Sequence, residues 1–305
     1  MKTDKIKNLA MVGACSLVLG MTVQAQTPFY SINGNGGTGG GTAGVSVTPS
    51  VSPAGSTALT DLGATTQFSF GSPSGLVDQS IVNAATGQGG SGVLAGTLGA
   101  SSSLSAFTVT LWVNMATATL NNYRYVEIAP GSPPTGSTAD GTQMFLGLNA
   151  GGGVQFYVNN VNNNYPQDVA GSATWNNGGT LGAVVANNWY FVAVTYDTVA
   201  GSALLYSGDL NDPAMLAYAY GNTVYTSGNL NLSSATSIAL TDRFSNGRNF
   251  PGAIDDVNIY SGALTPVQID AIQASEIVPT PEPATASMLV MGSLAGILML
   301  RRRQN

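Results

Sequence analysis

The side chains that most often carry catalysis are scarce in this chain of 305 residues. It contains no histidine and a single cysteine, Cys15. Because imidazole is missing, Ser-His-Asp and Cys-His catalysis are excluded, as are zinc sites that depend on imidazole or thiolate ligands. An enzyme built on this sequence would therefore have to work with carboxylates.

Paired carboxylates are the basis of polysaccharide hydrolysis, which needs two of them about 5 to 10 Å apart. Between the two ends of the chain the only glutamates are Glu127 and Glu276, and "YVEIAPG" gives Glu127 no acidic neighbour at i+2 or i+4. We therefore interpret Glu127 as a solvated strand residue and predict no catalytic residue. A hydrolase with an unfamiliar arrangement of carboxylates stays open as an alternative.

Asp255 and Asp256 form the acidic pair that is most interesting as a candidate site. If Val257 and Ile259 face a core, alternation along a strand directs Asp255 inward with them. A buried carboxylate requires backbone donors, an arginine or a cation. Asp255 is therefore either part of a structural hydrogen-bond network or a calcium ligand, because calcium accepts carboxylate, amide and carbonyl oxygens from flexible loops.

Other side chains could complete either arrangement around that carboxylate. Arg243 and Arg248 are the candidate partners for a structural network. Further calcium ligands would come from predicted turns that contain Asp209, Asp212 and Asp242, although aspartate is also a common turn former without any metal. No spacing in the chain matches an EF-hand loop. Calcium is thus the one candidate cofactor that the sequence suggests.

Aromatic side chains could stack against sugar rings if they are exposed together. Trp175 lies in the predicted loop "SATWNNGG" and is our candidate ligand-binding residue. Trp112 and Trp189 lie inside apolar strands, so we expect them to pack in a core. The tyrosines that could join a stacking surface are Tyr123, Tyr125, Tyr157 and Tyr165.

The elements that must position these residues are predicted strands. Apolar runs separated by Gly, Asn, Ser and Asp clusters recur from Thr60 to Ile272. In the segment "FTVTLWVN", which begins at Phe107, Phe, Val, Leu and Val alternate with Thr, Thr and Trp. Successive side chains of a strand point to opposite faces, so this pattern predicts a strand with two different faces. The segment "WYFVAVTY", which begins at Trp189, is apolar on both faces and predicts a central strand. The pattern predicts an all-β sandwich of two antiparallel sheets.

The segment "GRNFPGAIDDVNIYSGALTPVQIDAI" ends this region. It predicts a strand from Ala253 to Tyr260, a turn, and then one short helix. The residues from Thr265 to Gln268 form a capping box with proline at the first helical position, and Leu264 with Ile269 can form a hydrophobic staple around it.

The N-terminal segment predicts export. Three lysines precede an apolar run from Leu9 to Val23, and Val23-Gln24-Ala25 ends it with small residues at the positions that a signal peptidase reads. We expect residues 1–25 to be a signal peptide that is cleaved after Ala25. The alternatives are a permanent membrane anchor, for which the run is short and interrupted, and lipidation of Cys15 in a poor lipoprotein box.

The C-terminal segment, residues 276–305, predicts a membrane helix. An apolar run of seventeen residues, 284–300, separates Pro281-Glu282-Pro283 from Arg301, Arg302 and Arg303. As a helix the run would measure roughly 25 Å, a little less than a hydrocarbon core of about 30 Å. The arginines favour a cytoplasmic end, which leaves the rest of the chain outside the inner membrane. A stable tail anchor without processing is the alternative.

Between these ends we expect a loose Gly/Ser/Thr-rich leader at residues 26–59 and one sandwich domain at residues 60–275. The leader has few large apolar side chains to offset the entropy of ordering it, although "VSVTPSV" could add an edge strand. From Gln26 to Pro281, three arginines and no lysine stand against thirteen acidic residues, a net charge of −10 (3 − 13). This charge excludes nucleic acid as a partner, and without cysteine no disulfide stabilises the mature chain.

Four segments, "FTVTLWV", "NNWYFVAVTYD", "GSALLYSGD" and "FPGAIDDVNIYSGALTPVQI", resemble laminin G-like, concanavalin A-like jelly-roll domains. The resemblance implies two antiparallel sheets packed face to face, in a family whose members bind glycans, extracellular proteins or calcium. Residues before Phe107 depart from the family pattern, so no ligand site is carried over from them.

The C-terminal segment resembles a PEP-CTERM sorting signal. That resemblance implies a Gram-negative source, recognition of Pro281-Glu282-Pro283 by an exosortase-type transpeptidase, and transfer from an inner-membrane intermediate to the cell envelope or surface. The two resemblances together predict an exported, non-enzymatic binding or structural module associated with a glycan or exopolysaccharide. A ligand-free adhesin or matrix protein is a further alternative.

Overall fold

The computed structural model describes most of the central part of the chain. The described residues are 26–34, 37–38, 46–61, 68–71, 80–83, 93–99, 102–116, 123–131, 143–148, 153–158, 173–174, 186–220, 228–242, 244 and 247–277. The predicted signal peptide, the sorting motif, the apolar run and the arginine cluster lie outside them. Within the described residues, no helix is both long and apolar enough to cross a membrane.

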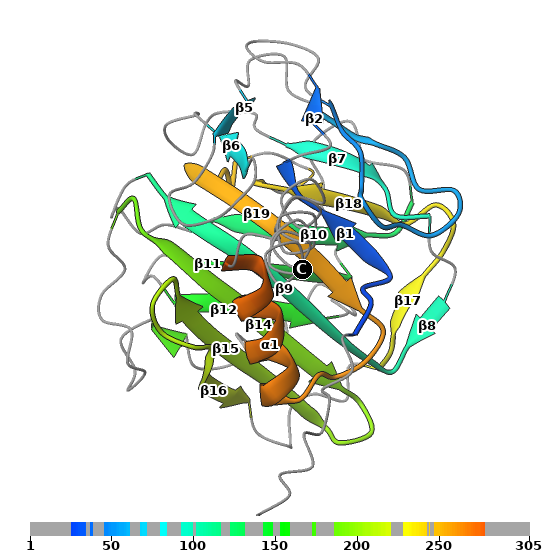
Figure 1. Ribbon diagram of the computed structural model, residues 1–305. Coiled ribbons are helices and arrows are strands. Elements are labelled where there is room, and N and C mark those ends of the chain that lie inside the picture. The colour runs from blue at the N-terminus through cyan, green and yellow to red at the C-terminus, as the bar shows by residue number, and fades with distance from the viewer. Residues whose placement is uncertain are drawn as a thin grey trace, which may run out of the picture.

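The first sheet is antiparallel and contains eight strands (Figure 1). One side of β19 pairs with β9, while β6 and β1 share its other side. In spatial order the strands are β16 (Met215–Tyr220), β15 (Ser202–Asp209), β14 (Trp189–Asp197), β9 (Ala106–Met115), β19 (Gly252–Tyr260), β6 (Ser80–Asn83) and β5 (Phe68–Gly71), with β1 (Tyr30–Ile32) beside β19.

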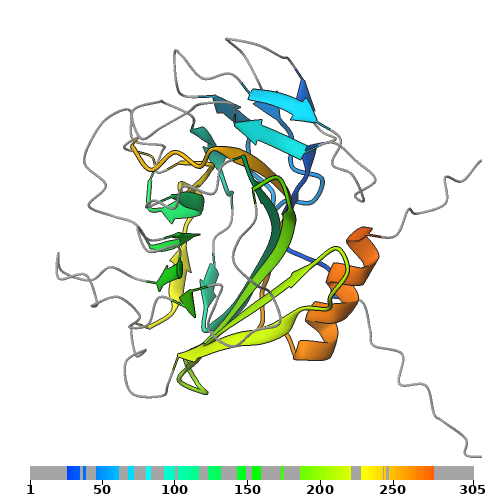
Figure 2. The same cartoon turned by 90° about the vertical axis from the view of Figure 1, so that its left-hand side faces the viewer.

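The second sheet is also antiparallel and lies across the first, so the two form separate layers (Figure 2). Its order is β13 (Ala173–Thr174), β12 (Gly153–Val158), β11 (Met144–Leu148), β10 (Arg124–Ala129), β18 (Ser237–Leu240), β7 (Leu94–Thr97), β4 (Leu59–Asp61), β3 (Ser46–Val47) and β2 (Gly37–Thr38). A short ribbon of β17 (Leu230–Leu232) and β8 (Ser102–Leu104) completes the described strands.

A continuous apolar core fills the space between the sheets. Alternate residues of β9 and β14 enter it, as the sequence pattern predicts, and β14 is a central strand between β15 and β9. The core residues from these two strands are Phe107, Val109, Leu111, Val113, Tyr190, Val192, Val194 and Tyr196. The predicted sandwich is therefore confirmed.

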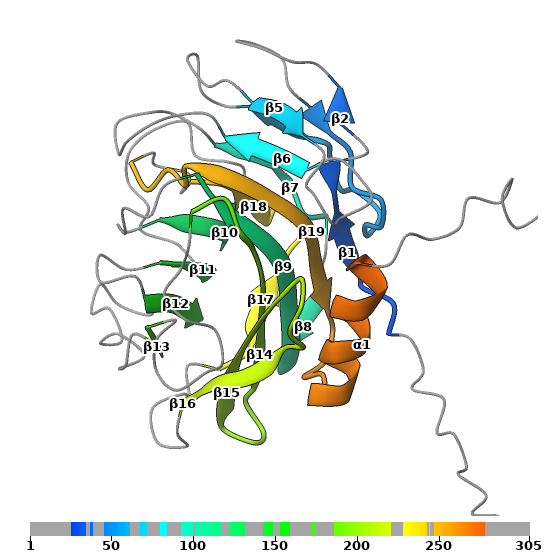
Figure 3. The same ribbon diagram turned by 60° about the vertical axis from the view of Figure 1, so that its left-hand side comes forward.

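A second apolar cluster lies between the outer face of the first sheet and α1 (Pro266–Ile277), the one helix in the part of the chain that the structure describes (Figure 3). Trp112 and Trp189 are buried in this cluster together with Leu264 and Ile269. The other face of β14 is thus buried as well, which explains why the strand is apolar on both sides. The predicted core role of both tryptophans is confirmed.

Helix α1 begins at the predicted capping box. The Thr265 N–H donates to Gln268 Oε1 at 2.9 Å, and the Gln268 N–H donates to Thr265 Oγ1 at 3.4 Å. Farther along, the buried Gln273 donates from Nε2 to the backbone oxygens of Asp209 and Asp212 at 2.8 and 2.9 Å. The helix is therefore fixed to the turn between β15 and β16 as well as to the face of the sheet.

A β-bulge interrupts β19 at Asp256. Asp255 lies opposite Trp112 on β9, and Asn258 lies opposite Thr110, so three steps along β19 match two steps along β9. The φ angle of Asp256 is 44°, a value that residues other than glycine rarely adopt. The bulge therefore changes which side chains of β19 face α1.

The bulge corrects the predicted orientation of Asp255. Val257 and Ile259 belong to the core between the sheets, as expected. Asp255 is fully buried, but it shares a face with its cross-strand partner Trp112, on the side of α1. The expectation that Asp255 points inward with Val257 is therefore wrong, because the extra residue reverses the alternation between them.

Residues 26–59 are not loose throughout, and that expectation is wrong for the residues of β1. The Phe29 N–H donates to the Ile259 carbonyl at 2.9 Å, and β1 continues as a strand beside β19. Tyr30 and Ile32 are fully buried in the core between the sheets. Within "VSVTPSV", the structure places β3 beside β4. Two apolar side chains suffice to order β1 because an existing sheet edge receives its backbone.

Candidate functional site

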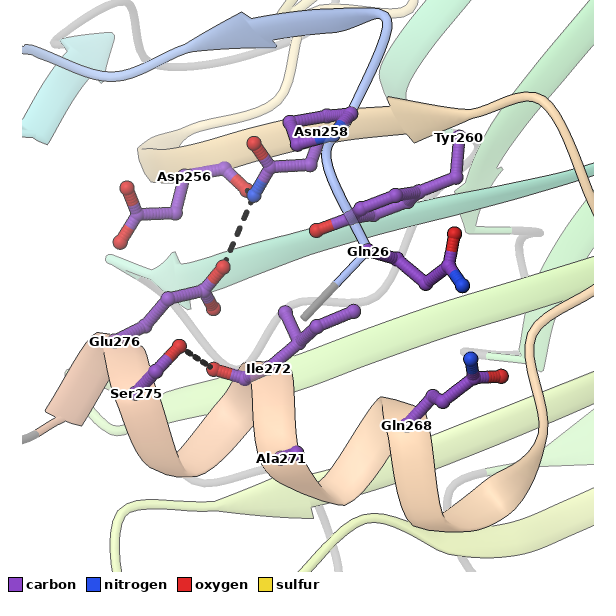
Figure 4. Close-up of a pocket in the computed structure, with 10 residues that line it drawn as sticks. Gln26, Asp256, Asn258, Tyr260, Gln268, Ala271, Ile272, Ser275 and Glu276 are labelled. Carbon is purple, nitrogen blue, oxygen red and sulfur yellow. Dashed lines mark hydrogen bonds between the residues drawn. The ribbon is translucent and has the colours of Figure 1, made fainter. Parts of the chain in front are cut away.

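A pocket of about 340 Å³ lies between β19 and α1, beside the beginning of the described chain (Figure 4). Three separate segments meet there because β1 brings the N-terminal segment alongside β19. The lining combines carboxylate, amide and hydroxyl groups with apolar side chains. It consists of Gln26 and Pro28 from the N-terminal segment, Asp256, Asn258 and Tyr260 from β19, and Gln268, Ala271, Ile272, Ser275 and Glu276 from α1.

Glu276, in the last turn of α1, is held by donors to both of its carboxylate oxygens. Trp112 donates from Nε1 to Oε2 at 2.8 Å, and Asn258 donates from Nδ2 to Oε1 at 3.0 Å. Hydrogen bonds from N–H donors to a carboxylate are charge-assisted and therefore strong. Glu276 consequently contributes a negative charge with a fixed orientation to the pocket.

Asp256 adds a second carboxylate to the same pocket. Its side chain is half-buried, and Figure 4 shows its carboxylate on the side of the pocket where Glu276 approaches from α1. The backbone oxygen of Asp256 accepts a hydrogen bond from Asn258 Nδ2 at 3.0 Å, which connects the bulge to the amide that also holds Glu276. The strained bulge is thus part of the pocket wall.

The charged side chains that line the pocket, Asp256 and Glu276, are both acidic. Tyr260 is only 4% exposed, and its burial, together with the carboxylates of Glu276 and Asp256, raises the pKa of its hydroxyl above the ordinary value. The last turn of α1 contains no basic residue that would offset the partial negative charge at the carbonyl end of the helix. None of the lining residues is basic.

This arrangement is suited to a group that carries positive charge or donates hydrogen bonds. Carboxylates only accept hydrogen bonds, and the amides and the Tyr260 hydroxyl add both donors and acceptors. Glycoside hydrolysis requires that one of two carboxyl groups act as an acid. Glu276 is poorly suited to that role because N–H donors occupy both of its oxygens. The geometry supports binding better than acid-base catalysis.

Two of the aspartates that are candidate calcium ligands accept backbone N–H groups of nearby residues. Asp209 Oδ1 accepts the N–H groups of Asn211 and Asp212 at 2.7 and 2.9 Å. Asp242 is fully buried, and its carboxylate accepts the Arg248 N–H at 2.7 Å. These contacts agree with the interpretation of the two residues as turn formers, and a calcium-binding role for them stays a prediction.

Asp255 accepts the N–H of Asp256 on Oδ1 at 2.9 Å. In the described part of the chain, no three His, Cys, Asp or Glu side chains form a group that could hold a metal ion. Arg243, one of its two candidate partners, lies outside the described residues. Calcium binding at Asp255 stays a prediction.

Glu127 is not solvated, and that expectation is wrong. It lies on β10 and is only 2% exposed, and its Oε2 accepts the Phe244 N–H at 3.1 Å. The neighbouring Val126 and Ile128 belong to the core between the sheets. The covering segment around Phe244 is remote in the sequence, so the pattern around Glu127 gave no signal of burial.

The predicted aromatic site cannot be assembled from the described residues. Trp175 and Tyr165 lie outside them, and ligand binding by Trp175 stays a prediction. Tyr123, Tyr125 and Tyr157 are buried and do not form an exposed stacking surface. The pocket beside α1 was missed because a bulge and two segments distant in sequence create it.

Two antiparallel sheets packed face to face, with one helix on the outer face of the first, define a concanavalin A-like sandwich protein. The model of the Laminin_G_3 family, described as the Concanavalin A-like lectin/glucanases superfamily, matches residues 87–270. The chain belongs to this family. A comparison with curated proteins finds no match.

Among solved structures, the chain is similar to the binding domain of botulinum neurotoxin serotype D, with 14% identity, a TM-score of 0.46, and 82% of this chain and 51% of that chain covered. For the ligand-binding domain of that serotype in complex with N-acetylneuraminic acid, the identity is 15% and the TM-score is 0.43, and the match covers 73% of this chain and 49% of that chain. For the binding domain of Paraclostridial Mosquitocidal Protein 1, the identity is 13% and the TM-score is 0.43, and the match covers 81% of this chain and 52% of that chain. The chain spans about half the length of these structures, and the likeness concerns the fold alone.

Proposed function

We propose that this protein is an exported, non-enzymatic binding or structural module that associates with extracellular polysaccharide at the cell envelope or surface. Its family membership supports a sandwich that presents a binding surface. The observation that carries the non-enzymatic part is the fixation of Glu276 by two N–H donors. The polysaccharide partner rests on the resemblance to laminin G-like and PEP-CTERM proteins.

Delivery follows from the two ends of the chain. Residues 1–25 are a signal peptide in this proposal, and Pro281-Glu282-Pro283 is the motif that an exosortase-type enzyme recognises. The apolar run 284–300 and Arg301–Arg303 hold the intermediate in the inner membrane of a Gram-negative cell until cleavage. The described helix α1 ends at Ile277, four positions before Pro281.

A glycan array tests the binding part of the proposal. The processed protein is purified and applied to immobilised bacterial and host polysaccharides in calcium and in chelator. We expect saturable binding to at least one class of polymer; retention that requires calcium would also support the prediction at Asp255. An array without a saturable signal in either condition would contradict the binding function and favour a ligand-free matrix protein.

Intact mass spectrometry tests the delivery part. Protein extracted from the cell surface should lack residues 1–25 and the segment from Ala284 to Asn305. Surface protein that retains the complete C-terminal segment would contradict processing and support a permanent tail anchor.

A carbohydrate-active hydrolase is the second candidate, because Asp256 and Glu276 line one pocket. This candidate predicts release of reducing sugar from a polysaccharide, and it predicts that Asp256→Asn and Glu276→Gln each abolish that release. We expect no release from the unmodified protein.

A further inference from the structure

We infer that the pocket between β19 and α1 binds the protein's own N-terminal ammonium group, which signal peptide cleavage creates on Gln26. This inference rests on the proposed export. In the cleavage, water adds to the Ala25 carbonyl carbon and the bond from that carbon to the Gln26 nitrogen breaks. The nitrogen leaves as an amine, which is protonated at neutral pH. The occupant of the pocket is therefore a segment of the mature chain itself.

Position is the first support. Gln26 already lines the pocket, together with Glu276 and Asp256, and Figure 4 shows Gln26 beside Tyr260 and Ile272. Three residues later, the hydrogen bond from Phe29 to Ile259 fixes the chain at the edge of β19. A tether of three residues keeps the new terminus within about 10 Å of that anchor. Cleavage after Ala25 thus releases the ammonium where the carboxylates lie.

Charge complementarity is the second support. Glu276 and Asp256 line the pocket together with the C-terminal end of α1, which carries a partial negative charge. None of the lining side chains is basic. Cations are also rare in the mature chain, since the region from Gln26 to Pro281 has three arginines and no lysine. Arg124 lies over the Phe145 ring at 3.5 Å from its centroid. With the three arginines, the ammonium on Gln26 is one of four cationic groups in this region, and none of the arginines lines the pocket.

The consequence is a link between the two ends of the mature domain. An ion pair between Gln26 and Glu276 would join the first residue after one predicted cleavage site to the last turn of α1. Glu276 precedes Pro281, the first residue of the predicted sorting motif, by five positions. Signal peptide cleavage would therefore stabilise the helix from which the sorting segment leaves.

Conversion of the N-terminal glutamine to pyroglutamate provides a test that does not change the length of the chain. In this reaction the amine of Gln26 attacks its own side-chain Cδ, the bond from Cδ to Nε2 breaks, and ammonia leaves, so the positive charge is lost. The full chain is exported in a Gram-negative host, and the processed protein is purified and treated with glutaminyl cyclase. Intact mass identifies the N-terminal residue and the extent of cyclisation, and thermal unfolding gives Tm before and after.

The matched variant is Asp256→Asn, because asparagine tolerates the positive φ of the bulge and removes only the charge. The control is Asp197→Asn, since asparagine can still accept the N–H groups of Val199 and Ala200 that Asp197 Oδ1 accepts. We expect cyclisation to be slower in the unmodified protein and in the control than in Asp256→Asn. We also expect cyclisation to lower Tm by about 2–4 °C in the unmodified protein and in Asp197→Asn. In Asp256→Asn the decrease should be less than half of that.

The outcomes separate this inference from the proposed function. A protein that begins at Gln26 but shows equal cyclisation rates and equal Tm shifts in all three forms would overturn the ammonium site and leave the exported module intact. Intact mass that shows residues 1–25 retained, or cleavage elsewhere, would overturn both the ammonium site and the predicted signal peptide.

Discussion

The two faces of the first sheet are both buried, but by different means. The inner face meets the second sheet through an apolar core that includes Leu111 and Val194. The outer face meets α1 through an apolar cluster around Trp112, and at its edge lies the hydrogen-bonded group of Glu276 and Asn258. The pocket between β19 and α1 lies on the outer face, and the bulge of β19 contributes Asp256 to its wall.

The two faces therefore depend on different interactions. Apolar packing on the inner face is non-directional and depends on volume. The polar group on the outer face depends on specific partners, because a buried donor or acceptor that loses its partner carries a desolvation cost. The loss of stability caused by a substitution should therefore depend on the volume removed on the inner face and on the hydrogen bonds removed on the outer face.

The largest effect is expected on the inner face. Leu111→Ala should lower the free energy of unfolding by about 2–5 kcal/mol, because it removes buried methyl groups and leaves a cavity. Chemical denaturation monitored by tryptophan fluorescence measures this change. Val199→Ala is the control, since Val199 is 87% exposed and should alter stability by less than about 0.5 kcal/mol. Similar losses in the two variants would contradict the assigned core.

On the outer face, Trp112→Phe should lower the free energy of unfolding by about 1–3 kcal/mol. Phenylalanine keeps much of the packing but removes the Nε1 donor of Glu276. A double-mutant cycle with Glu276→Ala, which removes both acceptor oxygens, isolates the contribution of the pair. Strictly additive effects would show that the hydrogen bond contributes nothing to stability.

The high pKa of Tyr260 predicts an alkaline loss of stability. The folded pKa lies above the unfolded value of 10.0, so the full contribution is present below pH 10 and is lost as pH rises from there toward the folded pKa. Above pH 10 the unfolded state releases a proton that the folded state retains. Tyr260→Phe should therefore reduce the slope of unfolding free energy against pH by up to about 1.4 kcal/mol per pH unit. An unchanged slope would contradict the burial of this hydroxyl.

The smallest effect is expected at the start of α1. Thr265→Ala removes the capping box and should lower the free energy of unfolding by about 1 kcal/mol. Thr265→Ser, which retains the hydroxyl, should be close to neutral. Equal losses in both variants would point to the methyl group rather than to capping.

The same contrast explains what the sequence could predict. Alternation in β9 and β14 and the capping box at Thr265 are local patterns, so the sandwich and its terminal helix could be inferred from single segments. The burial of Glu127 and the orientation of Asp255 depend on contacts between segments and on a bulge that no local pattern announces. The pocket also needs Gln26, which β1 brings to β19 from the other end of the domain.

The central claim is that this sandwich binds an extracellular polysaccharide without cleaving it. The most direct measurement incubates the processed protein with a soluble polysaccharide that it retains, and then determines the bound fraction by sedimentation and the molar mass of the polymer by light scattering. The account predicts saturable binding with an unchanged molar mass of the polymer. A polymer that becomes shorter with time would contradict it.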